Sequence, residues 1–265
     1  MSSFPYHRIF TRTWLAGFLS ANITLAAPAW VNRTVTLPRH DWAFDLGLGL
    51  GHRDRPSDVT GFGMNLEGSV GITQHLELGL RAGFRFDGDG RATQADEYGR
   101  LFDRETFGTS YDDFANPEFR IRGGLVNGRI FELALEGRVA LPVEDGTRIA
   151  SQFGMPVRLH LGNVVRLDTG LFVPVSFYDP VVYAVSVPLD VWIQASRDLW
   201  LGPMTGVRAS YGDPNDHTDV SFGFGIGYSV SRAFDIKGMV LMPAVNHAEG
   251  ARNFGVGFGF QARIE

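Results

Sequence analysis

Alternation between apolar residues and glycine or charge recurs in about twelve stretches from Trp42 to the C-terminus. Between His75 and Phe86, leucine, alanine and phenylalanine occupy the even positions, whereas glutamate, glycine and arginine occupy the odd positions. Because strand side chains alternate between two faces, such a stretch has one face suited to lipid and one suited to water. Its length also suits a tilted strand that crosses a bilayer. The pattern therefore predicts a transmembrane antiparallel up-and-down β-barrel of about twelve strands.

Short and long connections alternate along the predicted barrel. Strands are expected near 41–51, 60–72, 75–86, 115–125, 130–143, 152–161, 164–177, 181–194, 198–211, 218–230, 233–243 and 253–264. Short connections fall near 73–74, 127–128, 162–163, 195–197 and 231–232. Outer-membrane barrels place tight turns in the periplasm and long loops outside, so both termini are expected in the periplasm.

The N-terminus has the features of a secretory signal peptide. A basic start over residues 7–12 precedes an apolar stretch over 14–25, and Ala27-Pro28-Ala29 is a small-residue cleavage site before Trp30. Cleavage after Ala26 stays open, because proline directly after the scissile bond disfavours a cut after Ala27. We therefore expect a signal peptide over 1–29 and one barrel domain over 30–265, located in the bacterial outer membrane.

Composition excludes several other classes of protein. The chain of 265 residues contains no cysteine, which rules out disulfides and thiolate metal sites. It has no run of eighteen apolar residues, so a helical membrane protein is not expected. The formal net charge is −5 and the arginines are scattered, so no nucleic-acid partner is expected. No cofactor and no metal are predicted either.

Glycine distinguishes the membrane barrel from a soluble β-barrel or sandwich, in which the same alternation occurs with the faces exchanged. Glycine weakens a solvent-facing strand unless another group packs close to it. The inside of a curved barrel supplies such a reason. The predicted inward glycines are Gly47, Gly49, Gly51, Gly63, Gly71, Gly223, Gly225, Gly227, Gly255, Gly257 and Gly259.

Charged residues of the same inward parity gather on the third to seventh predicted strands and face the glycine wall. They are Glu77, Arg81, Arg85, Glu118, Arg120, Arg122, Glu132, Glu136, Arg138, Arg158, His160, Arg166 and Asp168. In one interpretation, arginines and carboxylates pair into a ladder that braces and occludes the barrel. In the other, the ladder lines a narrow aqueous pathway with a weak preference for anions, and the glycine wall provides clearance.

The longest predicted loop, residues 87–113, has an acidic excess. Loops of this length are usually functional or disordered. It is expected either to fold inward as a constriction or to stay outside as a solvated tip. Its opening, Asp87-Gly88-Asp89-Gly90, matches part of a calcium loop, but the remaining ligand positions are absent, so no metal site is predicted.

The last predicted strand resembles the assembly signal of outer-membrane proteins. Residues 253–260, Asn-Phe-Gly-Val-Gly-Phe-Gly-Phe, contain a polar residue, glycines and spaced aromatics, although the chain continues to Glu265 instead of ending on an aromatic. The resemblance implies the barrel-assembly machinery as a partner. The apolar outer face implies contact with outer-membrane lipid and lipopolysaccharide.

The middle of the chain is similar to the bacterial outer-membrane family named for the meta pathway of phenol degradation. The similar residues are 114–122, Phe-Ala-Asn-Pro-Glu-Phe-Arg-Ile-Arg, and the strand end at 139–142, Val-Ala-Leu-Pro. Asn116-Pro117 stands where the family has Asp-Pro, and Val143 to Gly146 replace its Thr-Gly. The resemblance implies a barrel that admits small hydrophobic compounds and assigns no functional residue.

Three functions follow from these observations. The first is an outer-membrane channel for passive passage of small solutes, with hydrophobic compounds and anions both open. The second is a non-conducting structural or adhesive barrel that presents its loops. The third is an outer-membrane hydrolase, with rim candidates His52, Asp216, His217, Asn246 and His247, but no motif ties a serine to them, so no enzyme is predicted.

Overall fold

The fold is a closed antiparallel β-barrel. A computed structural model describes residues 29–53, 59–85, 114–143, 149–177, 181–212, 216–247 and 252–265. Over these residues the chain forms twelve strands and one short 3-10 helix, η1, Trp30–Asn32. The strands are β1 Trp42–Arg53, β2 Val59–Gly71, β3 Leu76–Arg85, β4 Phe114–Asn127, β5 Phe131–Ala140, β6 Ala150–Leu161, β7 Val165–Ser176, β8 Val182–Gln194, β9 Leu199–Tyr211, β10 His217–Ser231, β11 Phe234–Met242 and β12 Phe254–Ile264.

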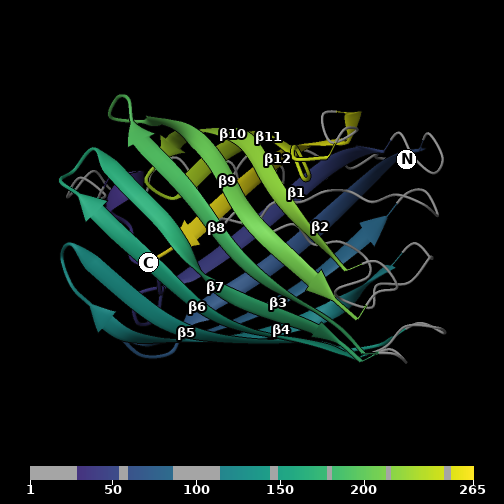
Figure 1. Ribbon diagram of the computed structural model, residues 1–265. Helices are drawn as coiled ribbons and strands as arrows, with labels where there is room; N and C mark the ends of the chain where they lie inside the picture. Colours follow the sequence, from purple (N-terminus) through teal and green to yellow (C-terminus); the bar gives the residue numbers. More distant parts are fainter. Residues whose placement is uncertain are drawn as a thin grey trace, which may run out of the picture.

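Every strand pairs with its neighbours in sequence, and the last strand closes on the first. Trp42 at the start of β1 lies opposite Val70 of β2 on one side and Ile264 of β12 on the other. The strands tilt across the barrel, and β12 runs beside β1 (Figure 1). This is the up-and-down topology that the alternating connections predict. The tight turns, the start of β1 and the end of β12 share one end of the barrel. The orientation of this end toward the periplasm stays a prediction.

The two faces of the sheet differ in polarity as the alternation predicts. Leu80, Phe153 and Phe258 point outward with exposed fractions of 60%, 55% and 57%. Glu136 and Asp168 point inward and are 1% and 0% exposed. Exposed apolar side chains all round a barrel, with charge inside, suit a protein surrounded by lipid. In the described part of the chain, no helix is long and apolar enough to cross a membrane.

The strand predictions are confirmed, because each observed strand end lies within about three residues of its predicted position. The fold class is confirmed as well. Residues 1–28 and the predicted loop over 87–113 lie outside the described residues, so the signal peptide and the role of that loop remain predictions.

The segment between η1 and β1 turns into the barrel at its short-turn end. The His40 amide donates to the Gly71 carbonyl over 2.7 Å, and the Gly71 amide donates to the Asp41 carbonyl over 3.0 Å. A Cβ at Gly71 would lie 1.8 Å from the carbonyl oxygen of Pro38, so only glycine allows this approach. His40 adopts the left-handed conformation, with φ of 72°. The chain therefore runs from the lumen, where most of residues 30–37 are buried, to the exposed residues 38–40 at the end of the barrel, and then enters β1.

Candidate functional site

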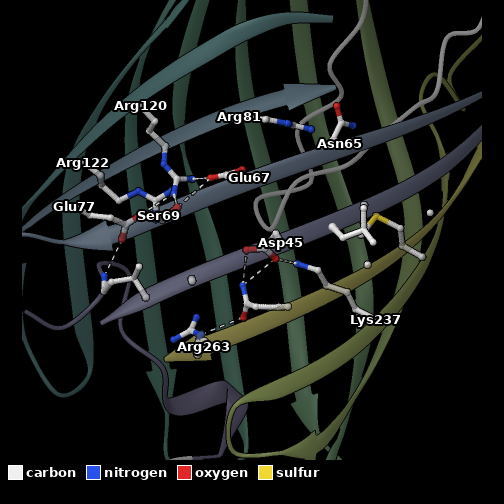
Figure 2. A pocket seen from close by; sticks show the side chains of 18 of the residues that line it. Asp45, Asn65, Glu67, Ser69, Glu77, Arg81, Arg120, Arg122, Lys237 and Arg263 are labelled. Carbon is white, nitrogen blue, oxygen red and sulfur yellow. Dashed lines mark hydrogen bonds and ion pairs between the residues drawn. The ribbon is translucent and has the colours of Figure 1, made fainter. Parts of the chain in front are cut away.

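The inward charges form ion-pair networks along β3 to β7. In the first part of this wall, Arg120 of β4 bonds to Glu77 of β3 over 2.7 Å, to Glu67 of β2 over 2.7 Å and to the Ser69 hydroxyl over 2.8 Å. Figure 2 shows these groups facing one another at one side of a cavity. The arginine is 8% exposed and Glu77 is 3% exposed, so both charges are compensated by direct partners instead of bulk water.

A second group of ion pairs continues the wall across β4 and β5. Arg122 donates from Nε and Nη2 to one oxygen of Glu136, over 2.8 and 2.6 Å. Arg138 donates to the other Glu136 oxygen over 2.7 Å and to Glu118 over 2.7 Å. Two arginines thus share one carboxylate, which orients both guanidinium groups.

A third group lies on β6 and β7. Arg158 and Arg166 both bond to Asp168, over 2.6 and 2.7 Å. On β5 and β6, Glu132 accepts from the His160 ring over 2.8 Å. All five side chains are less than a tenth exposed. The structure therefore brings the predicted ladder residues together as paired groups.

Segment 30–37 fills the space that the arginines face. The sequence pattern leaves open whether the arginines pair into an occluding ladder or line a pathway with clearance at the glycine wall. It does not predict that an N-terminal segment occupies part of the space between the two walls. Arg158 donates to the carbonyl of Arg33 over 2.8 Å, and Arg122 donates to the carbonyl of Val35 over 2.8 Å. The ladder therefore binds main-chain groups of the N-terminal segment as well as its own carboxylates.

An aromatic cluster holds the start of this segment. The ring of Trp30 stacks on Trp200 of β9 with centroids 4.6 Å apart, and it meets Trp192 of β8 edge-on with centroids 5.3 Å apart. Arg166 covers the Trp30 ring at 3.6 Å, close enough for a cation–π contact. The cluster buries several large apolar side chains inside a lumen that also contains many charged groups.

The predicted inward glycines are all buried, and several have a specific neighbour. A Cβ at Gly227 would lie 2.1 Å from Trp200, and one at Gly225 would lie 2.5 Å from Trp192. At Gly259 the nearest atom would be on Lys237, at 2.7 Å. Glycine on this wall therefore makes room for long side chains from neighbouring strands.

A cavity of about 100 Å³ remains beside segment 30–37, lined by residues of β1 to β5, β11 and β12. Figure 2 shows Lys237 reaching toward Asp45 in this cavity, with the two groups bonded over 3.3 Å. Arg81 lines the cavity from β3 and lies near Asn65 (Figure 2). The volume admits a few water molecules, so the lumen is narrow here.

Several lumen residues were missed by sequence reasoning. Asp45 shares the inward parity of Gly47, and Asp235 and Lys237 alternate in the same way along β11. Parity on these two strands was a signal that would have found all three. Arg33 pairs with Asp235 and lies 3.3 Å from the Gln261 side chain. Its position had no signal, because it precedes the first strand.

The other predicted residues fall into two groups. Arg85 ends β3, and its side chain lies outside the described part of the structure. At the rim, His217 and His247 approach the same carboxylate, Asp219, at 3.3 and 3.0 Å. His52 lies 3.0 Å from the hydroxyl of Thr60. The rim histidines thus have polar partners, and a hydrolase site built on them stays a hypothesis.

A closed barrel of twelve antiparallel strands, apolar outside and charged within, is the architecture of a bacterial outer-membrane β-barrel. No protein-family model and no curated protein sequence matches the chain. Its fold is similar to that of the COG4313 outer membrane channel from Pseudomonas putida F1, with 10% identity, 91% of this chain and 100% of that chain covered, and a TM-score of 0.61.

Two porins have the same fold. The NanC porin shares 7% identity, with 83% of this chain and 98% of that chain covered and a TM-score of 0.58. The KdgM porin shares 10% identity, with 84% and 99% covered and a TM-score of 0.56. These likenesses establish the outer-membrane barrel fold. The resemblance of residues 114–122 and 139–142 to the meta-pathway family stays a prediction.

Proposed function

We propose that this protein is an outer-membrane channel for the passive passage of small solutes, with a preference for anions. The observation that carries the proposal is the charge around the lumen cavity, which is lined by six cationic and three acidic side chains. Cationic groups in a narrow, low-dielectric passage raise the local concentration of anions. Similarity in fold to two porins and a channel supports the transport class.

Buried polar side chains make the lumen polar beyond segment 30–37 as well. Gln152 at the start of β6 and Ser176 at the end of β7 are buried and face inward. The amide nitrogen of Gln152 and the hydroxyl of Ser176 have no protein partner among the described residues. Buried polar groups of this kind are normally satisfied by water. A polar solute therefore suits this passage better than a hydrophobic compound.

The non-conducting barrel is the second candidate, and segment 30–37 is the observation that favours it. The segment crosses the lumen and is held by charged side chains from opposite walls, as when Arg158 and Asp235 bond to Arg33. A barrel braced in this way is stable without a pore. A measurement of conductance distinguishes the non-conducting barrel from a channel.

The surroundings of the barrel follow from the same proposal. Outward side chains such as Phe119, Phe224 and Phe258 would contact outer-membrane lipid and lipopolysaccharide. The β12 sequence would be recognised by the barrel-assembly machinery. Neither role involves the charged residues of β3 to β7, so variants of those residues should assemble normally when they fold.

The test is single-channel recording of the protein, purified from outer membranes, in a planar bilayer under a KCl gradient. We expect discrete conductance steps. The sign of the reversal potential should show that chloride is more permeant than potassium. Lys237→Gln and Arg81→Gln should each reduce that preference, because both remove a cation from the cavity. Arg197→Gln, in the exposed β8–β9 turn, is the matched control and should change nothing.

Two results would contradict the proposal. Silence from protein that is shown to be folded by its heat-dependent gel migration would favour the structural barrel. If the channel conducts but the Arg197→Gln control loses as much anion selectivity as the two cavity variants, the charges that set selectivity lie outside the cavity.

A further inference from the structure

The main chain of segment 30–37 is bound by side chains from five consecutive strands, β3 to β7. Carbonyl oxygens of the segment lie within hydrogen-bond distance of Arg166, His160, Arg158 and Arg122, at 3.3, 2.9, 2.8 and 2.8 Å. Its amides donate to the carboxylates of Glu132 over 2.6 Å and Glu77 over 2.8 Å. These contacts recognise a peptide backbone and are independent of the side chains that the segment carries.

Side chains of the segment add three anchors. Trp30 enters the cluster of Trp192 and Trp200. Arg33 reaches the far wall, where it donates to Asp235 over 3.2 Å from Nη2. Val35 packs against Ala134 and Phe172 in a small buried cluster. A tryptophan, an arginine three residues later and a valine two residues after that therefore define the sequence that fits this wall.

The wall and the segment are suited to reversible contact. Glu77 keeps Arg120 and Glu132 keeps His160 when the segment is absent, so these two carboxylates retain cationic or polar partners. Asp235 loses Arg33 and keeps the hydrogen bond from the Ser229 hydroxyl. The groups that bind the segment lie in a polar lumen, where water can replace each hydrogen bond. A segment tethered to β1 also rebinds readily, because a short tether gives an effective concentration in the millimolar range.

We propose that the inner wall of β3 to β7, together with Trp192, Trp200 and Asp235, is a peptide-binding site whose ligand is residues 30–37 of this chain. Occupied, the site closes the periplasmic mouth; vacated, it leaves the passage open. The segment is thus a detachable plug. The inference deepens the proposed channel function, on which the opening and closing rest, whereas the binding of the peptide does not depend on conductance.

The test uses a variant that lacks residues 30–37 and a synthetic peptide of sequence Trp-Val-Asn-Arg-Thr-Val-Thr-Leu, labelled with a fluorophore at its C-terminus. Fluorescence anisotropy should show saturable binding at one peptide per folded barrel. Peptides carrying Trp30→Ala or Arg33→Glu should bind at least tenfold more weakly, because each loses one anchor. A peptide carrying Asn32→Ser is the matched control, since none of the contacts above uses the Asn32 side chain.

Conductance is measured on the same variant. The truncated barrel should conduct more than the full chain, and the peptide added on the periplasmic side should restore the smaller conductance. Absence of saturable binding would overturn the peptide site whatever the conductance. Binding without any conductance would keep the site and overturn the channel function. Binding that leaves a measurable conductance unchanged would overturn the plug.

A second variant keeps the question answerable if the truncated chain fails to fold. Val35→Cys with Ala134→Cys places two thiols in one buried cluster, and the chain has no other cysteine. The oxidised pair should hold the plug in place and reduce channel opening severalfold relative to the reduced protein. Equal opening in both redox states, or failure of the pair to oxidise in the folded barrel, would overturn the inference.

Discussion

Trp30 and Trp200 stack face to face inside the barrel, with their ring planes 6° apart and their centroids 4.6 Å apart. The first lies ahead of the barrel in sequence and the second lies on β9. Room for the pair comes from Gly227 on the next strand, where any Cβ would collide with the Trp200 ring. A glycine in one strand thus fixes the position of a ring that receives the N-terminal segment.

Replacement of this glycine should destabilise the barrel. In Gly227→Ala the new Cβ would lie 2.1 Å from Trp200, and a buried ring has little freedom to move away. We expect a loss of about 1–3 kcal/mol in the free energy of unfolding, which is the usual cost of overpacking. Urea unfolding in detergent, followed by tryptophan fluorescence, measures it. Gly238→Ala is the control, because its nearest contacts would lie at an ordinary 3.8 Å; equal losses in both variants would contradict the packing argument.

Removal of the Trp30 ring should release the N-terminal segment without unfolding the strands. Trp30→Ala deletes the stack on Trp200 and the contact with Arg166, at a cost to docking of about 3 kcal/mol. We expect faster proteolysis of the segment by an added protease and more frequent channel opening. Trp30→Phe keeps an aromatic ring and should lie between the two. Unchanged proteolysis in Trp30→Ala would show that the ring does not hold the segment.

Charge reversal at Arg120 should affect both stability and selectivity. The guanidinium group compensates Glu67 and Glu77, so Arg120→Glu would place a third carboxylate beside two others. Breaking a buried pair costs about 3–5 kcal/mol. The cationic excess around the cavity would fall, because six cationic and three acidic side chains would become five and four. We expect a lower unfolding midpoint and a shift of the reversal potential toward cations. Arg197→Glu on the exposed turn is the control. A variant with normal stability and normal selectivity would refute both the bracing and the pathway roles.

Asp41, which precedes β1, gives the turn into the lumen a pH dependence. Partial burial raises the pKa of its carboxyl group, and Glu265 raises it further, whereas Arg263 opposes the shift. A raised pKa means that ionisation is less favourable in the folded protein than in the unfolded chain. The stabilisation from the protonated form is complete below the unfolded-state pKa of about 3.8 and is lost as pH rises through the folded-state pKa.

Asp41→Asn should therefore be no more stable than the natural chain at pH 3 and modestly more stable at pH 7. Glu265→Gln should act in the same direction with a smaller effect, because it relieves only the repulsion. Unfolding midpoints in detergent at the two pH values measure both. If Asp41→Asn raises the unfolding midpoint at pH 3 but not at pH 7, the pH dependence is opposite to the one expected from a raised pKa of Asp41.

The alternation of residue types along the chain is sufficient to predict the strands and their faces. Along Leu76–Arg85 the side chains alternate strictly, and a strand has only two faces, so parity alone places Glu77 inward and Leu80 outward. The same argument holds for β11, where parity places Asp235 and Lys237 on one face. The local sequence pattern is sufficient here, because the geometry of a strand places successive side chains on opposite faces of the sheet, whatever residues lie elsewhere in the chain.

The contents of the lumen, in contrast, depend on contacts that form only in the folded barrel. Residue parity places a side chain on one face of the sheet, but it does not give the position of that side chain along the barrel axis. It therefore does not predict that Arg122 and Arg138 share Glu136, or that Arg158 binds the carbonyl of Arg33. Residues 30–37 carry no strand period, and their position depends on groups from five strands that meet only after the barrel has closed. Contacts between residues far apart in sequence are set by closure and register, which is why the plug is a property of the folded chain.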